Sequence, residues 1–403
     1  MPSVPASGQP VAMTAGDPPQ PCHGVGPDRL SVMRTMVWKV ARLAAIVLAV
    51  LVVAGVSAVA VTRAAANGRE QLSRSVAAPA GPRSGWFNGG DVDFFVQEEG
   101  PRYGPTIVLL HGTGAWSEIW RSTMHTLGSG GYRVIAVDLP PFGYSKRPVN
   151  GDYSPEAQGR RLLALFDALQ LSDSIALVGH SFSARFAMEA VFMAPQRISS
   201  LVLVDAALDL DPPAESSPAP ASVRVVLGTP MLREAAVSAT LTNPYFTKSL
   251  LLKLISDSGA ATPQRVAMFQ KPFVVTGTTE AYGQWLDGFL TRRDRTRSTR
   301  SALYRSLSLP TLVIWGARDS VTPLPQGRAL AALIPGSQLA VLPNAGHIPA
   351  IESPQQFDAA LTGFLREVLP LRATTVYSPT PDENGSEVKK PPFVTGMKRP
   401  NPM

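Results

Sequence analysis

The sequence is poor in the residues that build disulfide frameworks and metal sites. Its 403 residues include one cysteine, Cys22, and five histidines. A single cysteine excludes an internal disulfide and a cysteine zinc site, and it leaves the redox compartment open. Few histidines also means few candidates for a general base. The histidines are His23, His111, His125, His180 and His347.

Charge is scarce over most of the chain, although the formal net charge is +7. Residues 1–84 hold eight Lys/Arg and three Asp/Glu, and residues 371–403 hold five and three, so residues 85–370 are neutral. Proteins that bind nucleic acid carry a basic footprint on the folded domain itself. The neutral central region therefore argues against a nucleic-acid partner.

The two ends of the chain lack apolar periodicity. Residues 1–36 and 371–403 are rich in proline, glycine, serine and charged residues, a composition that buries too little apolar surface to fold. Both are predicted to be disordered tails.

A long hydrophobic run occurs at residues 43–61, which contain no charge. As a helix these residues span about 28 Å at ~1.5 Å per residue, close to the ~30 Å hydrocarbon core of a bilayer. We expect a transmembrane signal anchor at 37–62 and a linker at 63–84. The short basic flank before the run and the long domain after it favour an extracytoplasmic domain, although the Lys/Arg counts on the two sides barely differ.

The same run has an alternative interpretation as a cleaved signal peptide, followed by secretion. Arg34, Lys39 and Arg42 would form its basic region, and S-A-V-A at 57–60 offers small residues for cleavage. The run exceeds the usual apolar core of about 7 to 15 residues, which favours the uncleaved anchor.

Strand and helix patterns alternate from residue 85 onward. Apolar strands separated by helices predict an α/β fold with a mostly parallel central sheet and helices on both faces. Residues 209–308 interrupt this order, so the core divides into parts at 85–208 and 309–370. Strands are predicted at 91–99, 106–112, 133–139, 174–179, 201–205, 310–316 and 338–343, and helices at 154–169, 182–194 and 354–369.

The stretch G-H-S-F-S at 179–183 follows an apolar strand and opens a helix. A strand-to-helix turn of the G-x-S-x-G type presents a serine hydroxyl at the top of such a sheet. The backbones nearly touch two residues on either side of the serine, so both positions need small residues. Gly179 satisfies this, and Ser183 replaces the second glycine. The context predicts that Ser181 is a nucleophile.

A serine nucleophile needs a base that accepts its proton and a carboxylate that orients the base. In folds built around this turn, the serine comes first in the chain, then the acid, then the histidine. His347 is the only histidine that follows Ser181. Asp319, just beyond an apolar strand, is the favoured acid. Asp205, at the end of another strand, is the alternative. Either aspartate alternatively serves as a turn or capping residue.

Attack on a carbonyl creates an oxyanion, which requires fixed N–H donors. The N–H after the nucleophile belongs to Phe182. A second donor is expected at Thr113, in the loop that contains H-G-T-G. His111 and His180 are then expected to brace this loop and the serine turn rather than to act as bases.

These motifs resemble the α/β-hydrolase superfamily, in its cap-bearing serine hydrolase and esterase branch. The resemblance covers residues 85–370 and implies the α/β-hydrolase fold after one transmembrane helix, with residues 209–308 as a helical cap or lid. It implies no metal and no organic cofactor. Pro141 and Ser183 depart from the usual glycines. The motifs are H-G-T-G (111–114), D-L-P-P-F-G-Y-S-K-R-P (138–148), G-H-S-F-S (179–183), W-G-A-R-D (315–319) and G-H-I-P (346–349).

We therefore expect a membrane-anchored serine hydrolase that cleaves carboxylic esters, including lipid-derived ones, through an acyl-enzyme on Ser181. A C–C bond hydrolase or a haloperoxidase-like perhydrolase would share the triad, and a non-catalytic binding scaffold would share the fold. The expected partners are a small-molecule ester and, through residues 43–61, a membrane. Acyl length and oligomeric state stay open.

Overall fold

The computed structural model describes residues 29–81, 83–171, 174–212, 219–291 and 295–371, with side chains from Trp38 onward except at position 41. Most of the two tails predicted to be disordered lies outside these residues. By their contacts, the residues divide into two units, Met1–Thr62 and Arg63–Met403.

Helix α1 (Arg29–Arg69) contains the long apolar run. It begins before the predicted anchor at 37–62 and ends after it. Residues 43–58 are exposed throughout, so this stretch has no face buried in protein. By length and composition, Trp38–Arg69 could cross a membrane, a property that signal sequences share.

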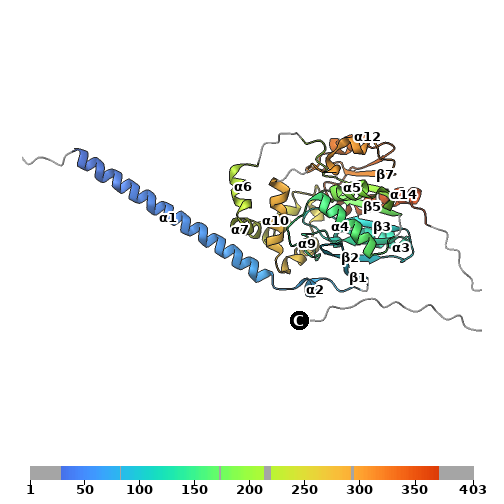
Figure 1. The fold of residues 1–403 in the computed structure, drawn as a ribbon, viewed down its shortest axis with the longest axis horizontal. Coiled ribbons are helices and arrows are strands. Elements are labelled where there is room, and N and C mark those ends of the chain that lie inside the picture. Colours follow the sequence, from blue (N-terminus) through green and yellow to red (C-terminus); the bar gives the residue numbers. More distant parts are fainter. Residues whose placement is uncertain (1–28, 82, 172–173, 213–218, 292–294, 372–403) are drawn as a thin grey trace, which may run out of the picture. The chain divides into compact units, whose positions relative to one another are not determined.

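The described residues of the second unit form an eight-stranded sheet with the order β1-β2-β4-β3-β5-β6-β7-β8 (Figure 1). β2 is antiparallel to both of its neighbours, and all other pairings are parallel, so the predicted fold class is confirmed. The edge strand β1 was not predicted because S-G-W-F-N lacks an apolar run. The strands are β1 (Ser84–Asn88), β2 (Asp93–Glu99), β3 (Thr106–Leu110), β4 (Arg133–Val137), β5 (Ile175–His180), β6 (Ile198–Val204), β7 (Thr311–Gly316) and β8 (Gln338–Leu342).

Helices cover both faces of the sheet because successive strand side chains point to opposite sides. In β3, Val108 and Leu110 join a core cluster with α4, α5 and α12, whereas Ile107 and Leu109 join a second cluster with α3 and α14. All four strand residues are fully buried. The covering helices are α3 (Arg121–Ser129), α4 (Pro155–Ala168), α5 (Ser183–Met193), α12 (Leu324–Leu333) and α14 (Pro354–Val368).

The described part of the predicted cap, residues 209–212, 219–291 and 295–308, forms helices between β6 and β7. Three of them begin at proline, which suits the first helical position because its missing N–H has no partner there. Asn243 and Thr262 cap two of these helices with their side chains. The cap helices are α6 (Ala221–Gly228), α7 (Pro230–Ala239), α8 (Pro244–Leu251), α9 (Pro263–Gln270), α10 (Thr278–Thr291) and α11 (Ser301–Tyr304).

The predicted linker at 63–84 is structured in the second unit. It contains the end of α1 and the short helix α2 (Arg74–Ala77), and Leu72 forms a parallel bridge with Val275 of the cap. No local pattern indicates this order, because its partners lie far away in the sequence. The remaining short helices are η1 (Ser117–Trp120), η2 (Pro195–Arg197), η3 (Ser258–Ala260), η4 (Lys271–Val274), η5 (Arg297–Thr299) and α13 (Pro349–Glu352).

Candidate active site

Ser181 lies in the tight turn between β5 and α5, at the carboxyl edge of the sheet. Its φ of 56° is a conformation that side-chain-bearing residues rarely adopt and that a nucleophile turn requires. Its N–H donates to the carbonyl of Val204 at 2.9 Å. A Cβ built on Gly179 would approach the Cα of Ala184 to 2.9 Å, so this position requires glycine. The turn predicted from the sequence is present.

Ser183, at the position of the usual second glycine, is fully buried and hydrogen-bonded. Its Oγ accepts the N–H of His180 at 3.0 Å and can donate to the carbonyl of His180 at 2.9 Å or to that of Leu110 at 3.1 Å. Leu110 is the last residue of β3, directly before the predicted oxyanion loop. The extra hydroxymethyl group therefore links the two strands that carry the site.

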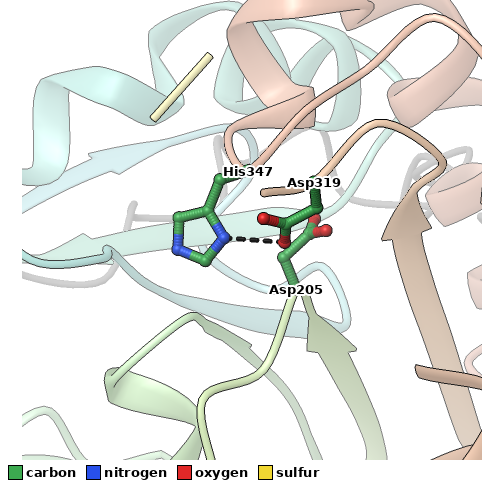
Figure 2. Close-up of side chains that lie close together, drawn as sticks. All are labelled: Asp205, Asp319 and His347. Carbon is green, nitrogen blue, oxygen red and sulfur yellow. Dashed lines mark hydrogen bonds and ion pairs between the residues drawn. The ribbon is translucent and has the colours of Figure 1, made fainter. Parts of the chain in front are cut away.

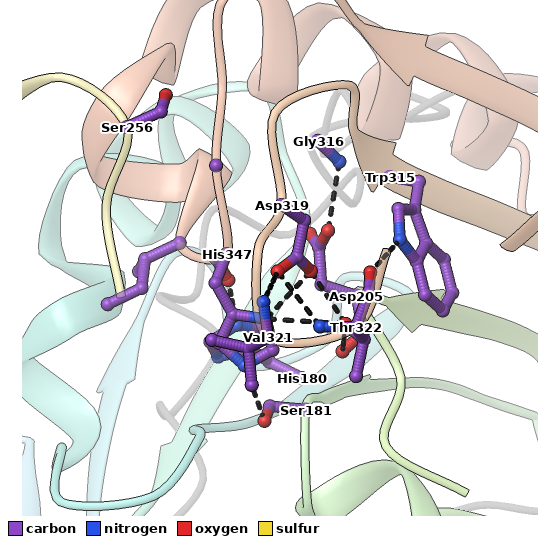
Figure 3. A network of polar contacts seen from close by, with 12 residues as sticks. His180, Ser181, Asp205, Ser256, Trp315, Gly316, Asp319, Val321, Thr322 and His347 are labelled. Atoms are coloured by element: carbon purple, nitrogen blue, oxygen red, sulfur yellow. Dashed lines mark hydrogen bonds and ion pairs between the residues drawn. The ribbon is translucent and has the colours of Figure 1, made fainter. Parts of the chain in front are cut away.

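His347 occupies the loop between β8 and α13, with Nε2 2.8 Å from Ser181 Oγ (Figure 3). Its backbone is fixed on both sides, because its N–H donates to Leu254 at 3.0 Å and its carbonyl accepts from His180 Nε2 at 2.7 Å. The Glu352 carboxylate accepts the N–H groups of the residues before and after His347, at 3.0 and 3.1 Å. The imidazole is thus held against the serine.

Asp319 follows β7, and its Oδ2 lies 2.8 Å from Nδ1 of His347 (Figure 2). Oδ1 accepts the N–H groups of Val321 and Thr322 at 2.7 and 3.0 Å, and the Thr322 hydroxyl donates to Oδ2 at 2.6 Å. Burial raises the pKa of Asp319. The hydrogen bond to His347, the charge of His347 and the hydrogen bonds from Thr322 outweigh burial and hold the pKa of Asp319 below its usual value. The ionised carboxylate places the His347 proton on Nδ1 and leaves Nε2 as the base.

Asp205, the alternative acid, ends β6 beside Asp319. Among the described residues it makes no hydrogen bond to His347, and its Oδ1 accepts the N–H of Gly316 at 2.9 Å. Burial raises the pKa of Asp205 well above its usual value, and the neighbouring charge of Asp319 raises that pKa further. Two adjacent buried carboxyls do not both ionise. Asp319 therefore carries the charge and Asp205 keeps its proton.

The same three side chains have a spacing that a metal ion also accepts. One ligand atom from each of Asp205, Asp319 and His347 lies within 4.8 Å of the others (Figure 2). A protonated carboxyl is a poor metal ligand, and the Asp319–His347 hydrogen bond already occupies one atom of each residue. The arrangement favours acid–base chemistry, and we assign no metal to it.

The two predicted oxyanion donors lie in the segments directly after β5 and β3. Among the described residues, neither the N–H of Phe182 nor that of Thr113 donates a hydrogen bond, so both are available to a ligand. The two segments are in close contact: a Cβ on Gly112 would approach Nδ1 of His180 to 2.6 Å. Thr113 is exposed, whereas Ser181 is only 6% exposed.

His111 and His180 are buried beside the site. Nε2 of His111 accepts the N–H of Leu139 at 2.8 Å, and burial lowers its pKa to about 4. Burial, and then the neighbouring His347, lowers the pKa of His180 to about 3. Both are neutral at neutral pH and contact backbone groups. Of the other two histidines, His125 is exposed on α3 and His23 lies outside the described residues.

Three supporting residues were given no role by the sequence. Asp138 accepts the N–H groups of Ser117 and Tyr144, both at 2.7 Å, and so joins the loops after β3 and β4. Burial raises its pKa to about 6. Thr322 and Glu352 fix the acid and the histidine loop. The D-x-x-T spacing at 319–322 is a side-chain-to-backbone turn pattern that would have indicated Thr322.

Aromatic side chains of the core and of α10 pack against Phe182, the residue that follows the nucleophile. The ring of Phe142 lies 4.9 Å from Tyr282, 5.0 Å from Trp285 and 5.6 Å from Phe182, and Trp285 lies 6.1 Å from Phe182. These separations are those of packed aromatic pairs.

Comparison with known proteins gives related sequences and folds. A family model described as alpha/beta hydrolase fold matches residues 105–354. An uncharacterized protein of Mycobacterium tuberculosis is 28% identical over 267 residues, which cover 63% of this chain and 73% of the relative. A 2-hydroxymuconate semialdehyde hydrolase of a Pseudomonas species is 28% identical over 275 residues, 65% of this chain and 87% of the relative.

Among solved structures, a thermophilic esterase from Thermogutta terrifontis superposes with a TM-score of 0.56 at 24% identity. The match covers 71% of this chain and 99% of that esterase. At this identity the likeness shows the fold alone.

Proposed function

Because the chain belongs to the alpha/beta hydrolase fold family, we propose that it is a serine hydrolase that cleaves carboxylic esters through an acyl-enzyme on Ser181. The observation that carries the proposal is the continuous chain of hydrogen bonds. His347 contacts Ser181 Oγ through Nε2 and Asp319 through Nδ1, both at 2.8 Å.

The chemistry follows from this geometry. Ser181 Oγ attacks the ester carbonyl carbon while His347 Nε2 takes its proton, and the N–H groups of Phe182 and Thr113 stabilise the oxyanion. The C–O bond then breaks as His347 returns the proton to the leaving alcohol. Water, deprotonated by the same nitrogen, attacks the acyl-enzyme and releases the acid. Asp319 stays ionised and stabilises the imidazolium formed in both halves.

Fluorophosphonate labelling and hydrolysis of p-nitrophenyl esters test this proposal on the full chain in detergent. Ser181→Ala should abolish labelling and lower kcat on the order of 10³-fold or more, with an unchanged circular dichroism spectrum. Ser122→Ala, on the exposed face of α3, is the matched control and should behave as wild type. A folded wild type that neither labels nor hydrolyses any ester would favour the non-catalytic scaffold.

A second candidate is a C–C bond hydrolase of the same fold. It is favoured by the 28% identity to the 2-hydroxymuconate semialdehyde hydrolase. Comparing kcat/KM for short esters, long esters and a vinylogous diketone separates the two candidates. Preference for the diketone by more than about tenfold, or 1.4 kcal/mol in the barrier, would replace the ester proposal.

We further propose that residues 43–61 anchor the enzyme in a membrane, with the catalytic domain extracytoplasmic. Their length, lack of charge and exposure in α1 support the proposal. Resistance of the full chain to carbonate extraction, and an intact N-terminus by mass spectrometry, are the expected results. Recovery of a soluble chain that begins near residue 61 would instead support the signal peptide.

A further inference from the structure

The segment that follows the apolar run is fixed to the cap. Arg63 forms an ion pair with Glu234 of α7 at 3.3 Å, and Arg69 donates to Ser238, about one turn further along α7, at 3.1 Å. These two pairings fix residues 63–69 along α7. The Arg63 pairing, which is the one nearer to the apolar run, lies toward the N-terminal end of α7.

The next residues of this segment bind α10 and the turn before it. The Glu70 carboxylate accepts the N–H of Thr279, at the N-terminus of α10, at 2.9 Å. Leu72 donates its N–H to Val274 and accepts that of Thr276, both at 3.0 Å. A carboxylate at a helix N-terminus is favourable to the helix dipole. The cap is therefore positioned by residues 63–72, which begin two positions after the end of the apolar run at residue 61.

One end of the cap exposes large apolar side chains, and we call it the apolar end of the cap. Val225 of α6 is 60% exposed, Met231 and Leu232 of α7 are 52% and 36% exposed, and Phe289 and Leu290 of α10 are 55% and 47% exposed. A cluster of exposed apolar side chains indicates a contact site, whereas single exposed apolar residues are ordinary on protein surfaces.

These side chains share one end because α7 and α10 are antiparallel. Thr242, just past α7, bonds to Thr279 at the start of α10 at 2.9 Å, whereas Arg233 near the start of α7 lies 3.9 Å from Asp287 near the end of α10. The exposed residues of α7 and α10 therefore lie beyond the Arg233–Asp287 pair.

The charge at this end suits an anionic lipid surface. Residues 219–232 contain Arg224, which is exposed, and no Asp or Glu, whereas Arg233 is largely buried and lies 3.9 Å from Asp287. The next acidic residue, Glu234, is paired with Arg63. An exposed apolar cluster beside the exposed Arg224, with both nearby acidic residues paired, suits the headgroup region of a bilayer.

We propose that the apolar end of the cap lies in the surface of the lipid bilayer, from which the enzyme takes an amphiphilic ester. This inference rests on the membrane anchoring and esterase activity proposed above. The ring of Phe289 stacks on Trp285 at 5.1 Å, and Trp285 contacts Phe182 beside the nucleophile. Phe289 thus connects the apolar end of the cap to the aromatic rings packed beside the nucleophile.

Fluorescence quenching in nanodiscs tests the contact directly. The full chain with Cys22→Ser and Met231→Cys carries a nitrobenzoxadiazole label, in nanodiscs of phosphatidylcholine and phosphatidylglycerol with or without doxyl-labelled phosphatidylcholine. The control is Tyr103→Cys, an exposed aromatic position before the amino end of β3. We expect blue-shifted emission and quenching at position 231 and neither at position 103.

The outcomes separate this inference from the anchoring proposal. Protein that fails to copurify with the nanodisc contradicts the anchor. Copurifying protein without quenching at position 231 overturns the lipid contact while the anchor stands. A blue shift without quenching by the doxyl lipid shows that protein, such as a second copy of the chain, covers this end, and it also overturns the proposal.

An activity comparison tests the functional part. The double variant Met231→Glu/Leu232→Glu should lower the rate on an ester embedded in anionic vesicles about tenfold, because charged side chains do not enter the bilayer surface, and should leave p-nitrophenyl acetate hydrolysis unchanged. Tyr103→Glu should affect neither substrate. If wild type hydrolyses neither ester, the esterase proposal fails and the quenching result stands by itself. Equal vesicle rates in wild type and the double variant would overturn uptake from the bilayer.

Discussion

The catalytic edge of the sheet and the cap are stabilised in different ways. At the edge, Ser181, His347 and Asp319 are joined at 2.8 Å, and each is also fixed by further bonds from its backbone or carboxylate. The cap helices are joined by pairs such as Thr242–Thr279 and Arg233–Asp287, and they leave large apolar side chains exposed at one end. The comparison indicates that the triad is preorganised, whereas the cap carries the exposed apolar surface for which we propose the lipid contact.

The largest effect on activity is expected at the catalytic edge, where Asp319 and Asp205 should respond very differently to substitution. Asp319→Asn removes the charge that orients and stabilises His347 and should lower kcat on the order of 10³- to 10⁴-fold. Asp205→Asn replaces a side chain that is already neutral and should cost less than about tenfold, or 1.4 kcal/mol. Both are measured as kcat on a soluble ester with folding checked by circular dichroism. Equal losses in the two variants would show that the acid is not assigned correctly.

The buried His111 should make a destabilising contribution to the core in acid, a contribution that residues 209–308, which contain no histidine, cannot make. The unfolded chain protonates His111 below about pH 6.5, whereas in the folded chain its pKa is about 4. The unfolded state therefore binds more protons in this window, and stability falls as pH falls from 6.5 to 4, by about 3 kcal/mol for this residue. Asp138, with its pKa raised to about 6, acts in the opposite direction.

Urea unfolding of wild type and His111→Gln between pH 7 and 4.5 measures this linkage. The variant should be less stable at pH 7 and should lose less stability on acidification. Parallel pH curves for the two proteins would contradict the assignment of a neutral buried His111.

Removing the bridge made by Ser183 should have a smaller effect. Ser183→Gly restores the residue usual at this position, yet it leaves the N–H of His180 without its acceptor and should destabilise the core by about 2 kcal/mol. Ser122→Ala, which is exposed, should change the free energy of unfolding by less than about 0.5 kcal/mol. Urea unfolding measures both variants. If Ser183→Gly leaves the protein as stable as wild type, the serine only fills space.

The smallest effect is expected in the cap. Glu70→Gln keeps the shape of the side chain but weakens its bond to the N-terminus of α10, at a cost of about 1 kcal/mol or less. Hydrogen exchange should quicken in α10 and stay unchanged in β3 and β5. Equal changes in helix and strands would mean that the cap and the core do not differ in local stability.

The sequence predicted most of the sheet because its strands are apolar runs buried on both faces. The strand expected at 106–112 is observed at Thr106–Leu110, and the helix expected at 154–169 is observed at Pro155–Ala168. The strand ends two residues earlier than expected, where His111 and Gly112 begin the oxyanion loop. Pairing with the neighbouring strands, and not local composition, sets the end of this strand. β1 was missed because its stability comes from pairing with β2.

The sequence by itself determined the elements whose signals are local: the serine turn, the order of serine, acid and histidine, the apolar run at 43–61 and the insertion between two strands. Only the tertiary structure decided that Asp319 and not Asp205 contacts His347. Only the tertiary structure likewise showed that Ser183 bonds to Leu110, 73 residues away, and that Glu70 bonds to Thr279, 209 residues away. The physical reason is that a hydrogen bond between distant residues leaves no periodic trace in either segment, whereas burial and backbone conformation do.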